Sequence, residues 1–175
     1  MSRFEIGAWV AGAVLLFWTV GAYNRLVALR NAIVRSFDPL DVAYVERRAL
    51  LERQVDAAEA VLTQAGQRLE ALRAANRQVD AARSHARAHP GAKGAITSLR
   101  LAEEILAEAR ARVPMATTAG TEIAELGTRI AERDTAIEFA RRQFNNAVLA
   151  YNAAVGQIPT RFIAAAFGFS TAGTL

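Results

Sequence analysis

The stretch FARRQFNNAVLAYNAAVGQIPTRFIAAAFGF, residues 139–169, joins a helical pattern to an apolar end. Its apolar side chains recur every three or four positions and predict one face of an α-helix: Phe144, Val148, Tyr151 and Val155. Asn145 and Asn152 are seven residues apart, which places both amides on the same side of that helix. Beyond Gln157, Arg161 is the only charged side chain. The stretch therefore predicts a bundle helix followed by a tail that needs an apolar partner.

The chain that precedes this stretch is also helical in character. Alanine, leucine, arginine and glutamate are common, and the 175 residues include only four prolines. A first apolar stripe follows residue 23: Leu26, Leu29, Ile33 and Phe37. Because a proline disfavours helix at the residue before it, we expect a break at Asp38 and a new helix that begins at Pro39.

The clearest periodicity lies in the next fifty residues. Spacings of four and three continue over four heptads at Leu51, Val55, Ala58, Leu62, Ala65, Leu69, Leu72, Asn76 and Val79. This stripe predicts one long helix over residues 39–88, with Gly66 as a soft point in its middle. Residues 89–91, His-Pro-Gly, predict its end and a reversal of the chain. We expect a shorter helix that ends near Pro114 and a long fourth helix over 121–157.

Helices of these lengths with short connections can bury their stripes together only as an antiparallel bundle. We therefore predict an all-α fold in which an N-terminal transmembrane helix continues into an antiparallel, four-helix-bundle-like domain with long coiled-coil-type helices. The predicted divisions are a transmembrane anchor at 1–23, a helical bundle at 24–158 and an apolar C-terminal tail at 159–175.

The predicted anchor is IGAWVAGAVLLFWTVGA, residues 6–22, which contains no charged side chain. As a helix it would extend about 25 Å, close to the ~30 Å hydrocarbon core of a bilayer. Trp9 and Trp18 lie near its two ends, where amphipathic rings favour the membrane interface. Residues 20–22, Val-Gly-Ala, also resemble the cleavage site of a signal peptide, and that alternative stays open. We favour an uncleaved anchor because the helical pattern continues past this site.

Flanking charges predict the orientation of the anchor. Arg25, Arg30 and Arg35 follow it, whereas Arg3 precedes it together with Glu5. The positive-inside rule then places the bundle on the cytoplasmic side of the membrane, with the periplasmic side as the alternative.

Two pairs of small residues within the anchor favour self-association. Gly7 is four residues before Ala11, and Ala8 is four residues before Gly12. Small residues at this spacing let two membrane helices approach closely, so we expect a homo-oligomer.

No feature of the sequence indicates catalysis. The 21 Lys and Arg residues, almost all arginine, alternate with 17 Asp and Glu, which gives a net charge of +4 without long runs of one sign. We therefore expect no nucleic-acid partner. The chain lacks cysteine, and its two histidines, His85 and His89, have the four-residue spacing of metal ligands but no third histidine to complete a site. Motifs for a nucleophile or a phosphate-binding loop are absent. We predict a non-enzymatic protein without metal or cofactor.

Two blocks at opposite ends of the domain match the pattern of a known family. The first block includes Tyr23, Asn24, Leu26, Val27, Arg30, Asn31, Asp41, Val42 and Arg47. The second includes Ile137, Ala140, Arg141, Arg142, Asn145, Val148, Tyr151, Asn152, Pro159, Phe167, Gly168 and Phe169. Between the blocks, only Leu50, Leu51 and Val55 match the family pattern. In these residues the chain resembles the LemA family of bacterial membrane-anchored helical proteins. The resemblance implies a transmembrane helix with an antiparallel bundle, and it supplies no established catalytic activity.

The asparagines suggest a structural role at the membrane end of the bundle. Asn24 and Asn31 repeat the seven-residue spacing of Asn145 and Asn152. Buried amides can fix one alignment between helices even at some cost in stability. We predict a polar seam between the first helix and the last, made by Asn24, Arg30, Asn31, Arg142, Asn145 and Asn152.

The apolar tail has three possible partners. It has too few polar groups for a free solvated end and is too short to span a bilayer as a helix. It could lie in the membrane interface, be covered by a neighbouring subunit or fold back on the bundle. We favour the first two, with Phe162, Phe167 and Phe169 as the contact residues.

These features together predict a single-pass protein of the bacterial inner membrane that acts as a self-associating helical scaffold. Its expected partners are the lipid membrane and further copies of the chain. The alternative is an accessory subunit that binds and regulates a membrane protein such as a protease.

Overall fold

The computed structural model describes residues 3–62, 65–113 and 121–175. Within these ranges the chain forms five helices and no strands: α1 Arg3–Glu59, α2 Gly66–Ala88, α3 Lys93–Ala111, α4 Thr121–Gly156 and α5 Thr160–Ala166. The predicted all-α fold is therefore confirmed, as are the third and fourth helices close to their predicted bounds.

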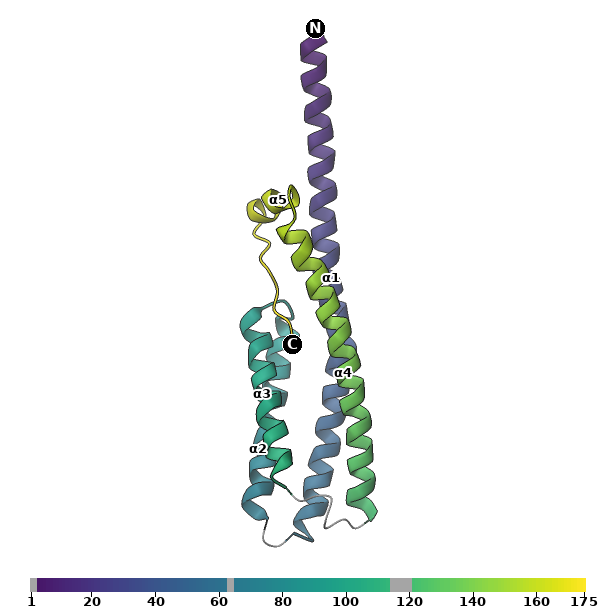
Figure 1. Cartoon of the computed structure of the whole chain (residues 1–175), viewed down its shortest axis with the longest axis vertical. Coiled ribbons are helices and arrows are strands. Elements are labelled where there is room, and N and C mark those ends of the chain that lie inside the picture. The colour runs from purple at the N-terminus through teal and green to yellow at the C-terminus, as the bar shows by residue number, and fades with distance from the viewer. Residues whose placement is uncertain (1–2, 63–64, 114–120) are drawn as a thin grey trace.

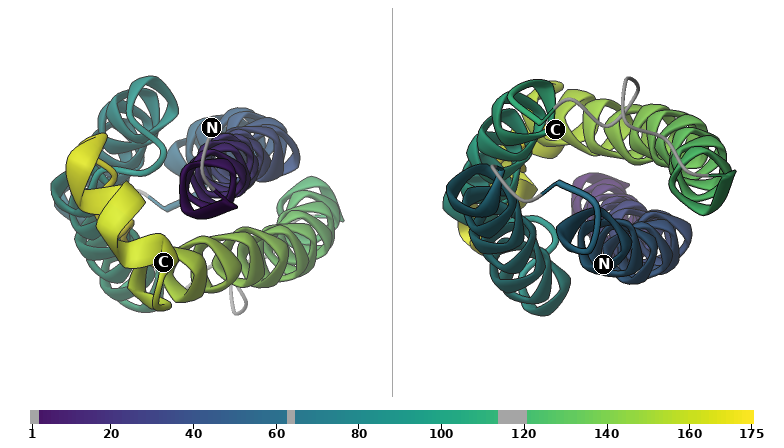
Figure 2. Two further views of the ribbon diagram at one scale, coloured as in Figure 1. Left: turned by 90° about the horizontal axis from the view of Figure 1, so that it is seen from above. Right: turned by 90° about the horizontal axis from the view of Figure 1, so that it is seen from below.

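The helices form an elongated bundle of two antiparallel pairs (Figure 1). α4 lies beside α1, α3 lies beside α2, and the two pairs meet where α2 packs against α1. Viewed along the long axis in Figure 2, α4 and the α2–α3 hairpin lie on different sides of α1. Among the described residues, Cα atoms of α4 come within 8 Å of α1 and α5 but not of α2 or α3.

The predicted stripes form the core. Phe37 of α1 and Phe144 of α4 are fully buried, and their ring centroids are 5.7 Å apart in an edge-to-face arrangement. Such a pair adds about 1 kcal/mol to the energy of apolar burial. The four apolar positions predicted on the fourth helix, Phe144, Val148, Tyr151 and Val155, are all buried, and their stripe extends towards the start of α4 through Ile123, Leu126, Ile130 and Ile137.

The expected break at Asp38 and Pro39 was wrong, because α1 continues through both residues. Phe37 and Leu40 on either side are fully buried, so the core holds the helix together across the proline. The proline ring itself is on the exposed side of the helix. There, solvent can satisfy the carbonyl of Arg35, which loses its usual N–H partner.

The single helix predicted over 39–88 was also wrong. α1 ends at Glu59 and α2 begins at Gly66, the residue expected only to soften the middle. The heptad stripe nevertheless points inward on both sides of this turn, since Leu51, Val55, Leu69 and Leu72 are all buried. Because α1 and α2 both turn their apolar faces toward the same core, the heptad pattern continues unchanged across the turn between them. The pattern alone therefore could not reveal the turn.

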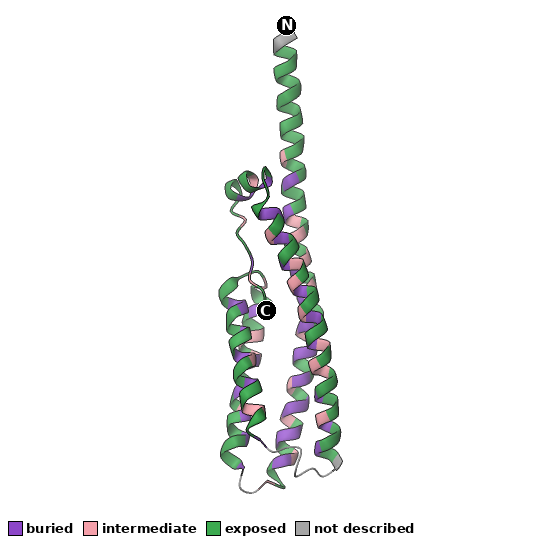
Figure 3. Ribbon diagram, in the orientation of Figure 1, coloured by how far each residue is buried: buried purple, intermediate pink, exposed green. Residues whose placement is uncertain are grey.

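The N-terminal part of α1 projects beyond the rest of the molecule (Figure 3). Of the described helices, α1 alone is long and apolar enough to cross a membrane. Its apolar 18-residue window has a mean hydropathy of 1.6, and none of it is buried. From Glu5 onward, Ala22 is the first buried residue of the helix. We call the end of the bundle near Ala22 the proximal end, and the end where α1 is followed by α2 the distal end.

Candidate functional site

The candidate site lies at the proximal end, where the C-terminal tail folds back on the bundle. After α5 the tail descends between α4 and the α2–α3 turn (Figure 1). Asn152 donates to the carbonyl of Ala172 at 3.0 Å and accepts from its N–H at 2.8 Å. Asn145 makes the same pair with Leu175, at 2.8 and 2.9 Å. Each amide thus binds the tail backbone as a neighbouring β-strand would.

Tyr151 adds a third contact between α4 and the tail. Its hydroxyl donates to the carbonyl of Ser170 at 3.0 Å. Burial raises the pKa of Tyr151, although the positive charge of Arg30 opposes this. The phenol therefore stays protonated at neutral pH and keeps its donor role. We call Asn145, Tyr151 and Asn152 with their partners in the tail the C-terminal clasp.

The other side of the tail rests on the turn between α2 and α3. A Cβ atom at Gly173 would lie 2.9 Å from the Cα of Lys93, so only glycine fits this close approach. Gly168 has a φ of 72°, in the left-handed region that glycine favours, and it turns the chain from α5 into the tail. The tail thereby connects α4 to the α2–α3 hairpin, which the helices do not do by direct backbone contact.

A crevice of about 420 Å³ opens beside the clasp. Its walls come from α1, the α2–α3 turn, α4 and the tail, and they include Arg30, Val34, His89, Tyr151 and Phe169. The crevice is lined by both apolar and polar groups and holds one formal positive charge, that of Arg30. A surface of this mixed character can bind chains or headgroups.

The α5 helix lies at the level where α1 leaves the bundle. The Tyr23 ring is 5.0 Å from that of Phe167 and 5.7 Å from that of Phe169, measured between centroids. Phe162 and Phe167 are 68% and 57% exposed, whereas Phe169 is half-buried. The residues beyond Phe169 therefore fold back on the bundle, which was the alternative that we did not favour. Phe162 of α5 and Phe167 at its end point outward.

The partner that we had predicted for the asparagines was wrong. Asn145 and Asn152 bind the tail, and the other four residues of the expected seam are exposed: Asn24, Arg30, Asn31 and Arg142. The six residues do lie at the proximal end, but they do not form one seam between α1 and α4. The residues predicted for membrane or oligomer contact in α1 are all exposed: Gly7, Ala8, Trp9, Ala11, Gly12 and Trp18.

A second polar cluster lies in the middle of the bundle. Arg47 of α1 is 5% exposed and its guanidinium donates to both carboxylate oxygens of Glu103 on α3 and, at 3.2 Å, to Asp134 on α4. Arg110 of α3 donates to the same Asp134 at 2.8 Å. Burial alone would lower the pKa of Arg47, but the hydrogen bond to Glu103 and the two carboxylate charges raise it. We call these four residues the central ion-pair cluster.

Tyr44 lies against this cluster. Its ring centroid is 5.1 Å from the guanidinium carbon of Arg47, within the range of a cation–π contact. Burial raises the pKa of Tyr44 well above its usual value, and the charge of Glu103 adds to the effect. Arg47 therefore remains charged and Tyr44 remains neutral, a fixed arrangement that suits packing rather than proton transfer.

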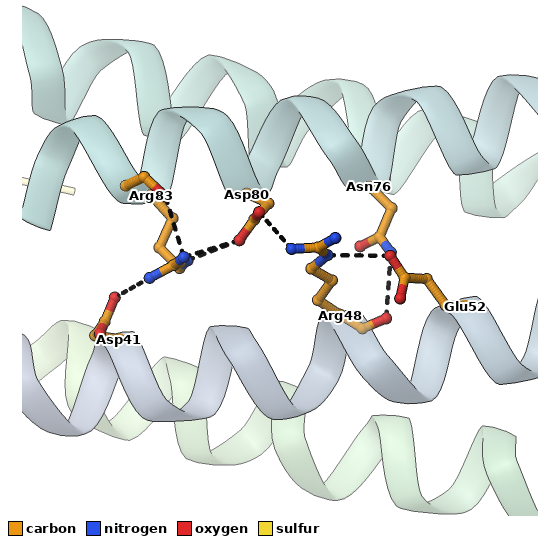
Figure 4. Close-up of polar contacts among 7 residues, drawn as sticks. Asp41, Arg48, Glu52, Asn76, Asp80 and Arg83 are labelled. Carbon is orange, nitrogen blue, oxygen red and sulfur yellow. Dashed lines mark hydrogen bonds and ion pairs between the residues drawn. The ribbon is translucent and has the colours of Figure 1, made fainter.

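Partly buried charged side chains also join α1 to α2 (Figure 4). Arg83 bridges Asp41 and Asp80 at 2.5 and 2.9 Å, and Arg48 bridges Asp80 and Glu52 at 2.5 and 3.0 Å. Fully exposed pairs contribute little individually, about 0–1 kcal/mol. Arg83, Asp41 and Asp80 are partly buried, and their network aligns the two helices.

The histidines do not assemble a metal site with other ligands. His85 and His89 are exposed, and their ring centroids are 5.1 Å apart. Within the described residues, no group of three or more His, Asp or Glu side chains is placed to hold a metal ion. The chain contains no cysteine that could add a ligand.

Sequence reasoning missed two sets of functional residues. The backbone groups of Ser170, Ala172 and Leu175 carry no side-chain signal, since any residue supplies the same N–H and C=O. The role of Glu103 could not be predicted from the sequence, because only the fold brings its carboxylate to Arg47.

Comparison with known proteins identifies a family for most of the chain. The sequence model of the LemA family matches residues 36–175, which include the central ion-pair cluster and the whole C-terminal clasp. No protein with curated annotation matches the chain.

Proposed function

We propose that this chain, which belongs to the LemA family, is a non-enzymatic scaffold held in the bacterial inner membrane by the N-terminal part of α1. The observation that carries the proposal is the exposure of this apolar segment on a helix continuous with the bundle. Trp9 is 73% exposed and Phe17 is 76% exposed, an arrangement that water would disfavour and lipid would stabilise.

The position of α5 supports the same assignment. Phe162 and Phe167 point outward at the level of Tyr23, which directly follows the apolar segment. Aromatic rings favour the boundary between headgroups and acyl chains. We assign α5 to this boundary, so that the anchor and the tail contact one leaflet together.

We place the bundle on the cytoplasmic side, because Arg25, Arg30 and Arg35 follow the anchor. Added protease should then leave the bundle intact in spheroplasts and digest it after the membrane is opened. Digestion in intact spheroplasts would place the bundle in the periplasm instead.

Self-association is supported by exposed apolar side chains on the outer faces of α1 and α4. They include Val34, Val42 and Val45 on α1 and Phe139 and Leu149 on α4. Within the membrane, the pairs Gly7–Ala11 and Ala8–Gly12 would let two anchors approach closely.

The decisive experiment is purification of the full chain in a mild detergent, followed by measurement of mass and composition. A homogeneous oligomer of this chain supports the scaffold function. A stoichiometric complex with a membrane enzyme such as a protease would favour the alternative, an accessory subunit. Recovery in the soluble fraction of a product that begins near residue 23 would contradict both, because it would identify the apolar segment as a cleaved signal peptide.

A further inference from the structure

The charges of the domain are divided sharply along its long axis. The proximal part comprises residues 24–37 of α1, residues 85–100 around the α2–α3 turn, and residues 139–175 of α4 and the tail. These segments contain nine Lys and Arg side chains and no Asp or Glu. The distal part, residues 38–62, 65–84, 101–113 and 121–138, contains eleven Lys and Arg and sixteen Asp and Glu. The formal charges are therefore +9 and −5 in a chain whose net charge is only +4.

Two of the nine proximal cations pair with carboxylates just across this boundary, Arg87 with Asp38 and Arg141 with Glu138. The two parts differ in how their other charges are neutralised. In the distal part, arginines such as Arg47, Arg73 and Arg83 each bind carboxylates of a neighbouring helix. In the proximal part, the nearest cations to the apolar segment are Arg25, Arg30 and Arg161, and all three are exposed. No ion pair involves any of them among the residues that the structure describes.

We infer that the proximal end binds the anionic headgroups of the leaflet it faces. Arg25 follows Ala22 by three residues, about 4.5 Å along the helix, and Arg30 by eight residues, about 12 Å. Arg161 belongs to α5, whose end is fixed at the level of Tyr23 by the ring contacts of Phe167. Arg25 can reach the headgroups with its own side chain, and the side chain of Arg30 can bring its charge to within one Debye length, about 10 Å. With Arg161 on α5, these residues form a basic collar around the base of the anchor.

We assign anionic phospholipid as the partner from the positive charge of the collar and from its position beside the apolar segment. The headgroups of the leaflet meet the chain where the apolar segment ends, and each cation held near an anionic surface strengthens association about fivefold. The carboxylates of the distal part begin at Asp38, 16 residues or about 24 Å along the helix from Ala22. This is about two Debye lengths or more from the headgroups, so the −5 charge does not offset the attraction of the proximal cations. This inference rests on the proposed membrane anchoring and adds a preference for anionic phospholipid.

The test uses the full chain in vesicles with Trp9→Phe, which leaves Trp18 near the collar as the only tryptophan. Its fluorescence is quenched either by brominated phosphatidylglycerol or by brominated phosphatidylcholine. We expect the anionic lipid to associate more strongly, by about fivefold for each cation that contacts a headgroup, and this preference to fall as salt is raised. Arg25→Gln, Arg30→Gln and Arg161→Gln together should remove it.

The matched control replaces three exposed distal arginines, Arg53, Arg68 and Arg129, by glutamine. Both triple variants have the same net charge, but only the collar variant should lose the lipid preference. Equal quenching by the two lipids in the parent, or an equal loss in the control variant, would overturn the inference. So would displacement of the anionic lipid by a short oligonucleotide at constant ionic strength, which would indicate a nucleic-acid site. Failure of the chain to float with vesicles would instead contradict the anchoring.

Discussion

The central ion-pair cluster and the C-terminal clasp both connect α4 to the α2–α3 hairpin, but they use different chemistry. The cluster uses charged side chains on helices, with Arg47 almost fully buried between Glu103 and Asp134. The clasp uses neutral amides of Asn145 and Asn152, which bind the backbone of a segment without regular structure. Among the described residues, no Cα atom of α4 comes within 8 Å of one in α2 or α3, so side chains and the tail make these connections. The cluster therefore holds the α1–α4 pair against the α2–α3 pair in the middle of the bundle, and the clasp does so at the proximal end.

This difference predicts different consequences when each contact is broken. A buried charge cannot return to water without opening the core, so loss of its partner destabilises the whole bundle. A tail held by four hydrogen bonds to two amides can detach while the helices stay packed. The cluster should therefore determine global stability and the clasp should determine local opening at the proximal end.

The largest effect is expected from Glu103→Gln. It removes the carboxylate that neutralises Arg47 and should lower the free energy of unfolding by about 3 kcal/mol. Denaturant unfolding of the detergent-solubilised chain measures this. Glu104→Gln changes an exposed neighbour and should leave stability within about 0.5 kcal/mol. A loss as small as that of the control would mean that Arg47 does not depend on Glu103.

Asn152→Leu should have a smaller and more local effect. It removes both hydrogen bonds to Ala172, at a cost of about 2 kcal/mol. Hydrogen exchange should become faster in residues 170–175 while the helices keep their protection. Asn31→Leu is the control, because Asn31 is exposed on α1. If Asn31→Leu opened the tail equally, an amide contact between α1 and α4 would be the better description.

Gly173→Ala tests the other side of the tail. The added methyl group would lie 2.9 Å from the Cα of Lys93, so the tail must lift from the α2–α3 turn at a cost of about 1–2 kcal/mol. Proteolysis at the C terminus should be faster in this variant. Gly94→Ala, in open space on α3, should instead stabilise the helix slightly. Equal protease resistance of the parent and Gly173→Ala would argue against the close packing.

Alkaline pH should weaken the cluster selectively. Burial holds the pKa of Tyr44 above its usual value of 10.0, so above that pH the unfolded chain releases a proton that the folded chain retains. The Tyr44 contribution is complete below pH 10 and decreases as pH rises toward the folded pKa, by about 1 kcal/mol per unit. Comparison of unfolding at pH 9 and pH 11 measures this. Tyr44→Phe should show a shallower decline, and an identical slope would exclude Tyr44 as the cause.

Features that depend on neighbouring residues were predicted correctly from the sequence, whereas features that depend on contacts between distant residues were not. The stripe of α4 and the stripe across α1 and α2 were predictable, because each apolar residue must be buried wherever its helix turns. The reversal between Glu59 and Gly66 was not, because residues 51–79 keep one heptad phase through the turn. Pro39 gave a false signal, since local strain at an exposed position was smaller than the burial energy of Phe37 and Leu40.

The sequence by itself determined an all-helical chain with an apolar N-terminal segment, its buried faces and its family. These depend on periodicity and composition, which are local. The tertiary structure alone decided that Asn145 and Asn152 bind the tail, that Arg47 meets Glu103 and Asp134, and that the cations gather at one end. Those contacts join residues about 20 to 90 positions apart, and their energies depend on burial and distance, which no local pattern contains.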